Sequence, residues 1–210
     1  MLRMWLRWSF RDLRARWIQV AAIALVIALG TGSYAGLSSV TVWRINSGEA
    51  SYDATNMYDL RARLAVGNYV PAGSLEAALD QLSDPTAVEA VEERLLVPTQ
   101  IDASTEDQTI LVTGRIVGVD LSNGGPHVNA VWPLIGNGLS EADTGTDLVV
   151  LERNFAKHYN LPEQGEILLA GDRPIAYVGH ATSPEYFTVV TETGVYLAES
   201  TFAALFTSLE

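Results

Sequence analysis

The sequence predicts an α+β protein, with an N-terminal amphipathic helix and a transmembrane helix followed by a mixed α/β core domain. Three observations support this fold class. The first 16 residues carry arginines at helical spacing, residues 17–43 contain no charged side chain, and strand-like segments outnumber helical ones beyond residue 44. We therefore divide the chain into residues 1–16, residues 17–43 and residues 44–210.

The charge of the 210-residue chain is split between its two ends. Residues 1–44 hold six arginines and one aspartate, whereas residues 45–210 hold seven basic and 24 acidic side chains. An acidic body repels phosphate backbones, so no nucleic-acid partner is expected. The sequence has no cysteine, which excludes disulfide scaffolds, thiolate zinc sites and cysteine nucleophiles.

The first 16 residues have the pattern of a helix that lies on a lipid surface. Leu6, Phe10, Leu13 and Trp17 recur at the same spacing as the arginines, which predicts one apolar and one basic face. The side chains expected to face lipid headgroups are Arg3, Arg7, Arg11, Arg14 and Arg16.

Residues 17–43 are long enough to cross a bilayer. As a helix they rise about 40 Å, against roughly 30 Å for the hydrocarbon core, so the helix has an extracytoplasmic extension. The positive-inside rule then predicts a cytoplasmic N-terminus and an extracytoplasmic segment 44–210 in the cell membrane. Two alternatives are a soluble helix leading into a buried core helix, and a signal peptide cleaved after Ser33-Tyr34-Ala35. Because uncharged sequence continues to Trp43, we favour an uncleaved span.

Small residues recur every four positions along this segment, at Ala24, Ala28, Gly32 and Gly36. Such a stripe allows a second transmembrane helix to approach closely, so we predict that it is a helix-packing face. The alternative is that small residues are simply common in membrane helices.

The pattern of residues 44–210 predicts short strands with a few helices. A hairpin is expected across Gly171-Asp172, Ser74 is a candidate N-cap, and the region around residues 132–136 reads as irregular. The expected strands are residues 57–66, 88–101, 109–119, 147–151, 166–170, 174–179 and 194–198, and the expected helices are 74–82, 152–159 and 199–209.

No group of residues has the spacing of a catalytic or metal site. His127, His158 and His180 are scattered, and neither a P-loop nor a G-x-S-x-G motif occurs. The chain is therefore expected not to be an enzyme and to hold no cofactor or metal. Two acidic groups are interpreted as solvated surface, namely Glu89, Glu92 and Glu93, and Glu141, Asp143 and Asp147.

Three stretches resemble an ABC transporter permease of the FtsX/MacB-like group. They are WSFRDLRARWIQVAAIALVIALGTGSYAGLSSV, with its "RDLR" before the apolar run, then LERNFAKHYNLPEQGEILLAG, then RPIAYVGHATSPEYF. The order of elements resembles an N-terminal transmembrane helix followed by a MacB-like periplasmic core domain. This resemblance covers nearly all of the chain and rests on the order of its elements.

The resemblance implies a membrane permease subunit whose extracytoplasmic domain relays ATP-driven motion for efflux, lipoprotein release or mechanotransmission. It implies an ABC ATPase subunit that hydrolyses ATP on a partner chain, further permease transmembrane helices, a dimer and contact with the lipid bilayer. Members of this group have later transmembrane helices, so we expect this chain to be a fragment whose core domain is incomplete at its C-terminus. The alternative is a signal-anchored extracytoplasmic sensor or binding domain without an ATPase.

Overall fold

The computed structural model describes residues 2–65, 67–187 and 199–209 of the chain. These residues form two compact units, Met1–Ala50 and Ser51–Glu210. The first unit is helical and the second contains the whole sheet, which confirms the α+β fold class with an N-terminal helix.

Two helices occupy the N-terminal part, α1 (Leu2–Ala15) and α2 (Trp17–Thr55), and Arg16 separates them. With 39 residues, α2 continues past Trp43 into charged sequence. Among the described residues it is the one helix long and apolar enough to cross a membrane, and its most apolar stretch is not buried against the rest of the chain.

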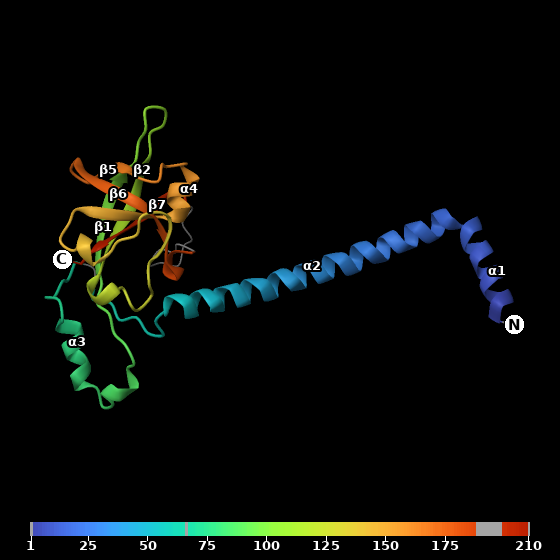
Figure 1. The fold of residues 1–210 in the computed structure, drawn as a ribbon, viewed down its shortest axis with the longest axis horizontal. Coiled ribbons are helices and arrows are strands. Elements are labelled where there is room, and N and C mark those ends of the chain that lie inside the picture. Colours follow the sequence, from blue (N-terminus) through green and yellow to red (C-terminus); the bar gives the residue numbers. More distant parts are fainter. Residues whose placement is uncertain (1, 66, 188–198, 210) are drawn as a thin grey trace. The chain divides into compact units, whose positions relative to one another are not determined.

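The second unit is built on a mixed seven-stranded sheet (Figure 1). Its strands are β1 (Leu95–Asp102), β2 (Leu111–Val119), β3 (Trp132–Gly136), β4 (Leu148–Glu152), β5 (Gly165–Leu169), β6 (Arg173–Thr182) and β7 (Phe202–Ser208). Its short helices are α3 (Ser74–Ala78) and α4 (Arg153–His158).

Among the described residues, six of the seven strands close into a ring. The strand order is β3-β6-β4-β7-β2-β1-β5, and β5 also pairs with β6. Pairing is parallel between β2 and β7 and between β4 and β6, and antiparallel elsewhere. Closure removes the open edges from these six strands, which leaves β3 as an edge strand beside β6.

The core lies on both sides of the central strand β7. Ala203 and Leu205 join one buried cluster, which includes Phe155 of α4, while Ala204 and Phe206 join the other. Because β7 is buried on both faces, its sequence is a continuous apolar run without alternation.

This burial explains why the helix expected at 199–209 is wrong. The run Ala203–Phe206 has no period of two, and alanine and leucine favour helices locally. Hydrogen-bonded neighbours on both sides, β2 and β4, override that preference.

Two other expectations need correction. Residues 57–65 and 88–94 form no strand, because neither segment has a pairing partner in the sheet. Residues 132–136 are strand β3 rather than irregular, since backbone pairing with β6 tolerates Pro133 at an edge.

Several local predictions are confirmed. The hairpin of β5 and β6 turns at Gly171 (φ 82°) and Asp172 (φ 56°), both in the left-handed region that such tight turns require. Strands β2 and β4 and helix α4 lie where they were expected, whereas α3 begins after Gly73 rather than with Ser74 as its cap. The strand expected at 194–198 lies outside the described residues.

Candidate functional site at the end of the long helix

The last turn of α2 belongs to the sheet unit, and polar contacts hold it there. Thr55 is 5% exposed and is the buried residue of α2. Its carbonyl oxygen accepts a hydrogen bond from the Ala130 amide at 2.7 Å. Asn56 then ends the helix with φ 49°, and its carbonyl oxygen accepts from the Asn129 amide at 2.8 Å. Its side-chain amide donates to the His127 carbonyl oxygen at 2.9 Å.

The loop that receives the helix end, residues 127–130, is held from the other side by Glu92 and Arg94. The Arg94 guanidinium donates to the carbonyl oxygens of Val128 (2.7 Å) and Asn129 (2.8 Å). The Glu92 carboxylate accepts from the amides of His127 (2.8 Å) and Val128 (2.9 Å), and lies 3.2 Å from Arg94.

The Glu92 and Arg94 side chains are only 9% and 14% exposed, respectively. The interpretation of Glu92 as part of a solvated acidic surface is therefore wrong. Its carboxylate is needed inside, where it satisfies backbone amides that have no other partner in a strand or helix.

Asn129 connects loop 127–130 to the segment that follows β6. Asn129 is 1% exposed, and its side chain accepts a hydrogen bond from the Ser183 hydroxyl at 2.9 Å and donates to the Glu185 carboxylate at 3.2 Å. Glu185 also forms an ion pair with Arg61, a residue of the chain that leaves α2. We call these residues the coupling network: Thr55, Asn56, Arg61, Glu92, Arg94, His127–Ala130, Ser183 and Glu185.

Two tyrosines lie near enough to the charged end of the network to be affected by its charges. The Arg61 guanidinium carbon lies 5.6 Å from the centre of the Tyr58 ring, within reach of a cation–π contact. Burial, and then the negative charge of Glu185, raises the pKa of Tyr58. The same two causes raise the pKa of Tyr186 to about 12. Both phenols are thus neutral at physiological pH and do not supply a base.

The coupling network ties four separate segments of the chain together. Its carboxylates are bound to arginines or backbone amides, and it contains no nucleophile activated by a neighbouring base. Because each of its groups is bonded to at least one other segment, a displacement of residues 55–56 cannot occur without moving loop 127–130 or breaking hydrogen bonds.

The residues expected from sequence to be functional lie elsewhere. Ala24, Ala28, Gly32 and Gly36 are exposed on α2, and a Cβ placed at Gly32 or Gly36 would meet nothing within 4 Å. On the N-terminal segment, Arg7, Arg11, Arg14 and Arg16 are exposed, and Arg16 lies 3.7 Å from Asp12. Arg3 is part of α1, but its side chain is outside what the structure describes. Packing of the stripe and contact of the arginines with lipid stay predictions.

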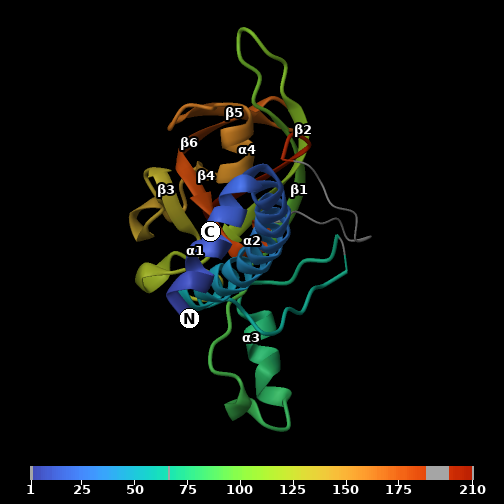
Figure 2. The ribbon, with the colours of Figure 1, turned by 90° about the vertical axis from the view of Figure 1, so that its right-hand side faces the viewer.

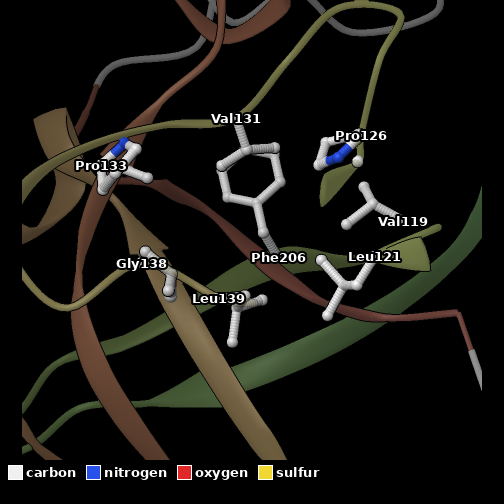
Figure 3. Close-up of a pocket in the computed structure, with 11 residues that line it drawn as sticks. Val119, Leu121, Pro126, Val131, Pro133, Gly138, Leu139 and Phe206 are labelled. Carbon is white, nitrogen blue, oxygen red and sulfur yellow. The ribbon is translucent and has the colours of Figure 1, made fainter. Parts of the chain in front are cut away.

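A small pocket lined mainly by apolar residues lies near β2, β3 and β7 (Figure 3). The Phe206 ring lies near its centre, and Leu121, Pro126, Val131 and Leu139 surround it. The cavity volume is about 50 Å³, whereas pockets for small organic ligands measure roughly 300–1,000 Å³. We therefore interpret it as a packing defect of the second core cluster.

Within the described ranges, no three His, Asp or Glu side chains are placed so that they could share a metal ion. His180 is buried in β6, with Nε2 2.9 Å from the Pro162 carbonyl oxygen, and His127 enters the coupling network through its backbone.

The sequence analysis did not identify the coupling network. Asn56, directly after a long helix, carries a weak signal, because asparagine often ends helices in the left-handed conformation. Arg94, Asn129 and Ser183 carry no local signal, since their roles depend on partners 34 to 56 positions away.

Comparisons with known proteins give one structural similarity. No family model matches the sequence, and no curated protein matches it. Among solved structures, the chain is similar to the extracellular domain of the noncanonic ABC-type transporter YknZ from Gram-positive bacteria, with 12% sequence identity and a TM-score of 0.39. That match covers 64% of this chain and 62% of the other, so it spans less than two thirds of that domain.

Proposed function

We propose that this chain belongs to a membrane-anchored permease subunit of an ABC-type transporter, with residues 44–210 outside the cytoplasm. Three properties of the chain support the proposal: the arginine-rich α1, the apolar α2, and the resemblance of three sequence stretches to the FtsX/MacB-like group. ATP hydrolysis takes place on a partner ATPase subunit, and this chain itself is not an enzyme. It works with further permease helices, as a dimer.

One observation carries the proposal furthest. The apolar stretch of α2 and the buried Thr55 belong to the same uninterrupted helix, and Thr55 and Asn56 are bonded to the sheet unit. A membrane anchor that served only to tether a domain would need no such fastening, since a flexible linker would suffice.

The coupling network defines the route by which helix motion would reach the sheet. Loop 127–130 is bonded to Arg94, the residue directly before β1. Through Asn129 the loop is also bonded to Ser183, the residue directly after β6. Strand β6 pairs with β3, β4 and β5, so a displacement that enters there moves much of the ring together. Among the activities of the FtsX/MacB-like group, this arrangement fits mechanotransmission.

The first test concerns the partner. The chain is purified in mild detergent from membranes of its native cell, and the co-purifying proteins are quantified. A nucleotide-binding ATPase subunit at stoichiometric amounts is expected. Recovery of the chain without any such subunit would instead favour the alternative, an anchored sensor or binding domain that needs no ATPase.

The second test concerns motion. The native chain has no cysteine, so spin labels can be placed at Arg44→Cys and Glu106→Cys, and their separation measured in the purified complex with and without ATP. We expect an ATP-dependent change that is lost in Asn56→Gly/Arg61→Ala, which removes two side-chain contacts of the coupling network and keeps the left-handed turn accessible. Arg173→Ala, which removes an exposed ion pair, is the control. An equal change in both variants would contradict the coupling role.

A further inference from the structure

A long segment connects α2 to β1. We call its residues 69–91 the arm, and these residues are almost entirely exposed. Helix α3 and the turns Leu79–Gln81 and Pro85–Ala87 contain no buried residue. Figures 1 and 2 both show α3 standing away from the sheet.

The arm is nonetheless an ordered element, because Glu93 closes its base. The Glu93 carboxylate accepts hydrogen bonds from the amides of Gly73 (2.6 Å), Leu75 (2.6 Å) and Glu76 (3.0 Å). Burial opposes ionisation of Glu93, but these three amides outweigh it, and they lower its pKa. At neutral pH the charged carboxylate therefore holds the start of α3 against the returning chain.

Large apolar side chains are exposed along the arm in unusual density. Leu82, directly after the turn Leu79–Gln81, is 46% exposed. The others with more than a third of their surface exposed are Tyr69, Val70, Leu75, Val88 and Val91. An ordered segment with this many exposed apolar groups is typical of a protein interaction surface.

The charge of the arm restricts what can cover it. The arm contains four carboxylates, Glu76, Asp80, Asp84 and Glu89, and no lysine or arginine. The basic helix α1 of a second copy lies on the opposite side of the membrane in the orientation proposed above. A second copy of the sheet unit is disfavoured, because residues 45–210 hold 24 acidic and only seven basic side chains. Anionic lipid is disfavoured for the same reason.

We propose that the arm is a docking surface for a different protein, one that presents an apolar helix face flanked by lysine or arginine side chains. The leucines and valines supply the contact area, and the carboxylates select a basic partner and exclude acidic ones. This inference rests on exposure, charge and the membrane orientation proposed above, and does not depend on a transport activity.

The test uses the whole chain in nanodiscs of neutral phosphatidylcholine. The probe is a fluorescent 18-residue amphipathic helical peptide of leucine and lysine, and its binding is followed by anisotropy. We expect Glu76→Lys/Asp80→Lys to weaken binding at least about tenfold. The matched control Glu106→Lys/Asp107→Lys, with the same change of net charge in the exposed loop after β1, should weaken it less than about twofold. Equal losses in the two variants would show that the peptide senses only net charge, and would overturn the proposal.

A second pair of variants tests the apolar part. Leu75→Ser/Leu82→Ser should weaken binding at least about fivefold, whereas Leu111→Ser/Leu134→Ser, at exposed leucines off the arm, should not. All four positions are exposed, so the fold is expected to survive each substitution. Equal binding of a matched leucine–glutamate peptide, or self-association of the chain that Leu75→Ser/Leu82→Ser abolishes, would also overturn the proposal, the latter in favour of a second copy.

Discussion

Among individual residues, Arg94 is the one whose loss should most affect the coupling network. Its guanidinium serves two carbonyl oxygens of loop 127–130 and balances the charge of Glu92. Arg94→Met leaves the mostly buried Glu92 carboxylate without its counter-charge, and removal of one partner from such a pair is strongly destabilising. We expect a loss of about 2–4 kcal/mol in the free energy of unfolding, because the pair is not completely buried.

The measurement is native-state hydrogen exchange of amides in β2 and β7 of the full chain. The exposed pair Arg173–Asp147 provides the control, and Arg173→Met should cost less than about 0.5 kcal/mol. The double variant Glu92→Gln/Arg94→Met should lose less than the sum of its single variants, since they share one interaction. Additive losses would contradict the ion pair.

Glu152 is expected to make the folded state less stable as the pH rises, which is the less usual direction for a carboxylic acid. Glu152 lies at the start of α4 and is 3% exposed. One of its carboxylate oxygens, Oε1, is buried without a hydrogen-bond partner among the described residues. Burial raises its pKa above the ordinary 4.5, although the amides of Asn154 and Phe155 lower it in part. The folded state thus holds the proton more tightly than the unfolded state does.

The contribution of Glu152 to stability is therefore fully present below pH 4.5 and is lost as the pH rises through the raised pKa of the folded state. Glu152→Gln removes this dependence, so the variant should gain in urea midpoint relative to the native chain as the pH goes from 4.5 to 8. Glu166→Gln, at an exposed position, controls for the loss of one carboxylate. A constant difference between Glu152→Gln and the native chain across this range would contradict the assignment.

Of the secondary-structure elements, α2 presents the feature most open to experiment, its stripe of small residues. If Ala24, Ala28, Gly32 and Gly36 face another helix, Gly32→Leu should weaken association several-fold by crowding the backbone contact. Ile27→Leu, on the same helix but off the stripe, should be nearly silent. A membrane-helix association assay compares the two, and equal behaviour would count against the stripe.

For the molecule as a whole, the prediction that matters most is its orientation in the membrane. Single cysteines at Ser9→Cys in α1 and Glu106→Cys in the sheet unit can each be labelled with a membrane-impermeant maleimide in intact cells. The arginine-rich N-terminus predicts labelling at position 106 and, at position 9, labelling only after permeabilisation. Labelling at position 9 in intact cells would reverse the topology, and absence of residue 9 from the mature protein would indicate cleavage.

Local sequence patterns were sufficient to predict secondary structure wherever a residue's environment depends on its near neighbours in the chain. The arginine spacing and the uncharged run predicted the N-terminal helices, and Gly171-Asp172 predicted the β5–β6 hairpin, because the left-handed turn is a property of those residues. The same reasoning failed at β7, where burial on both faces erases the alternation by which a strand is recognised.

Only the tertiary structure decided which distant segments meet. The coupling network joins the end of α2, the approach to β1, loop 127–130 and the segment after β6, and no periodicity in the sequence encodes those encounters. The tertiary structure also shows that Glu92, which the sequence suggested was a surface charge in an acidic stretch, is an interior hydrogen-bond acceptor. The physical reason is that hydropathy and charge patterns are local along the chain, whereas the pairing of buried polar groups is determined by strand order and ring closure.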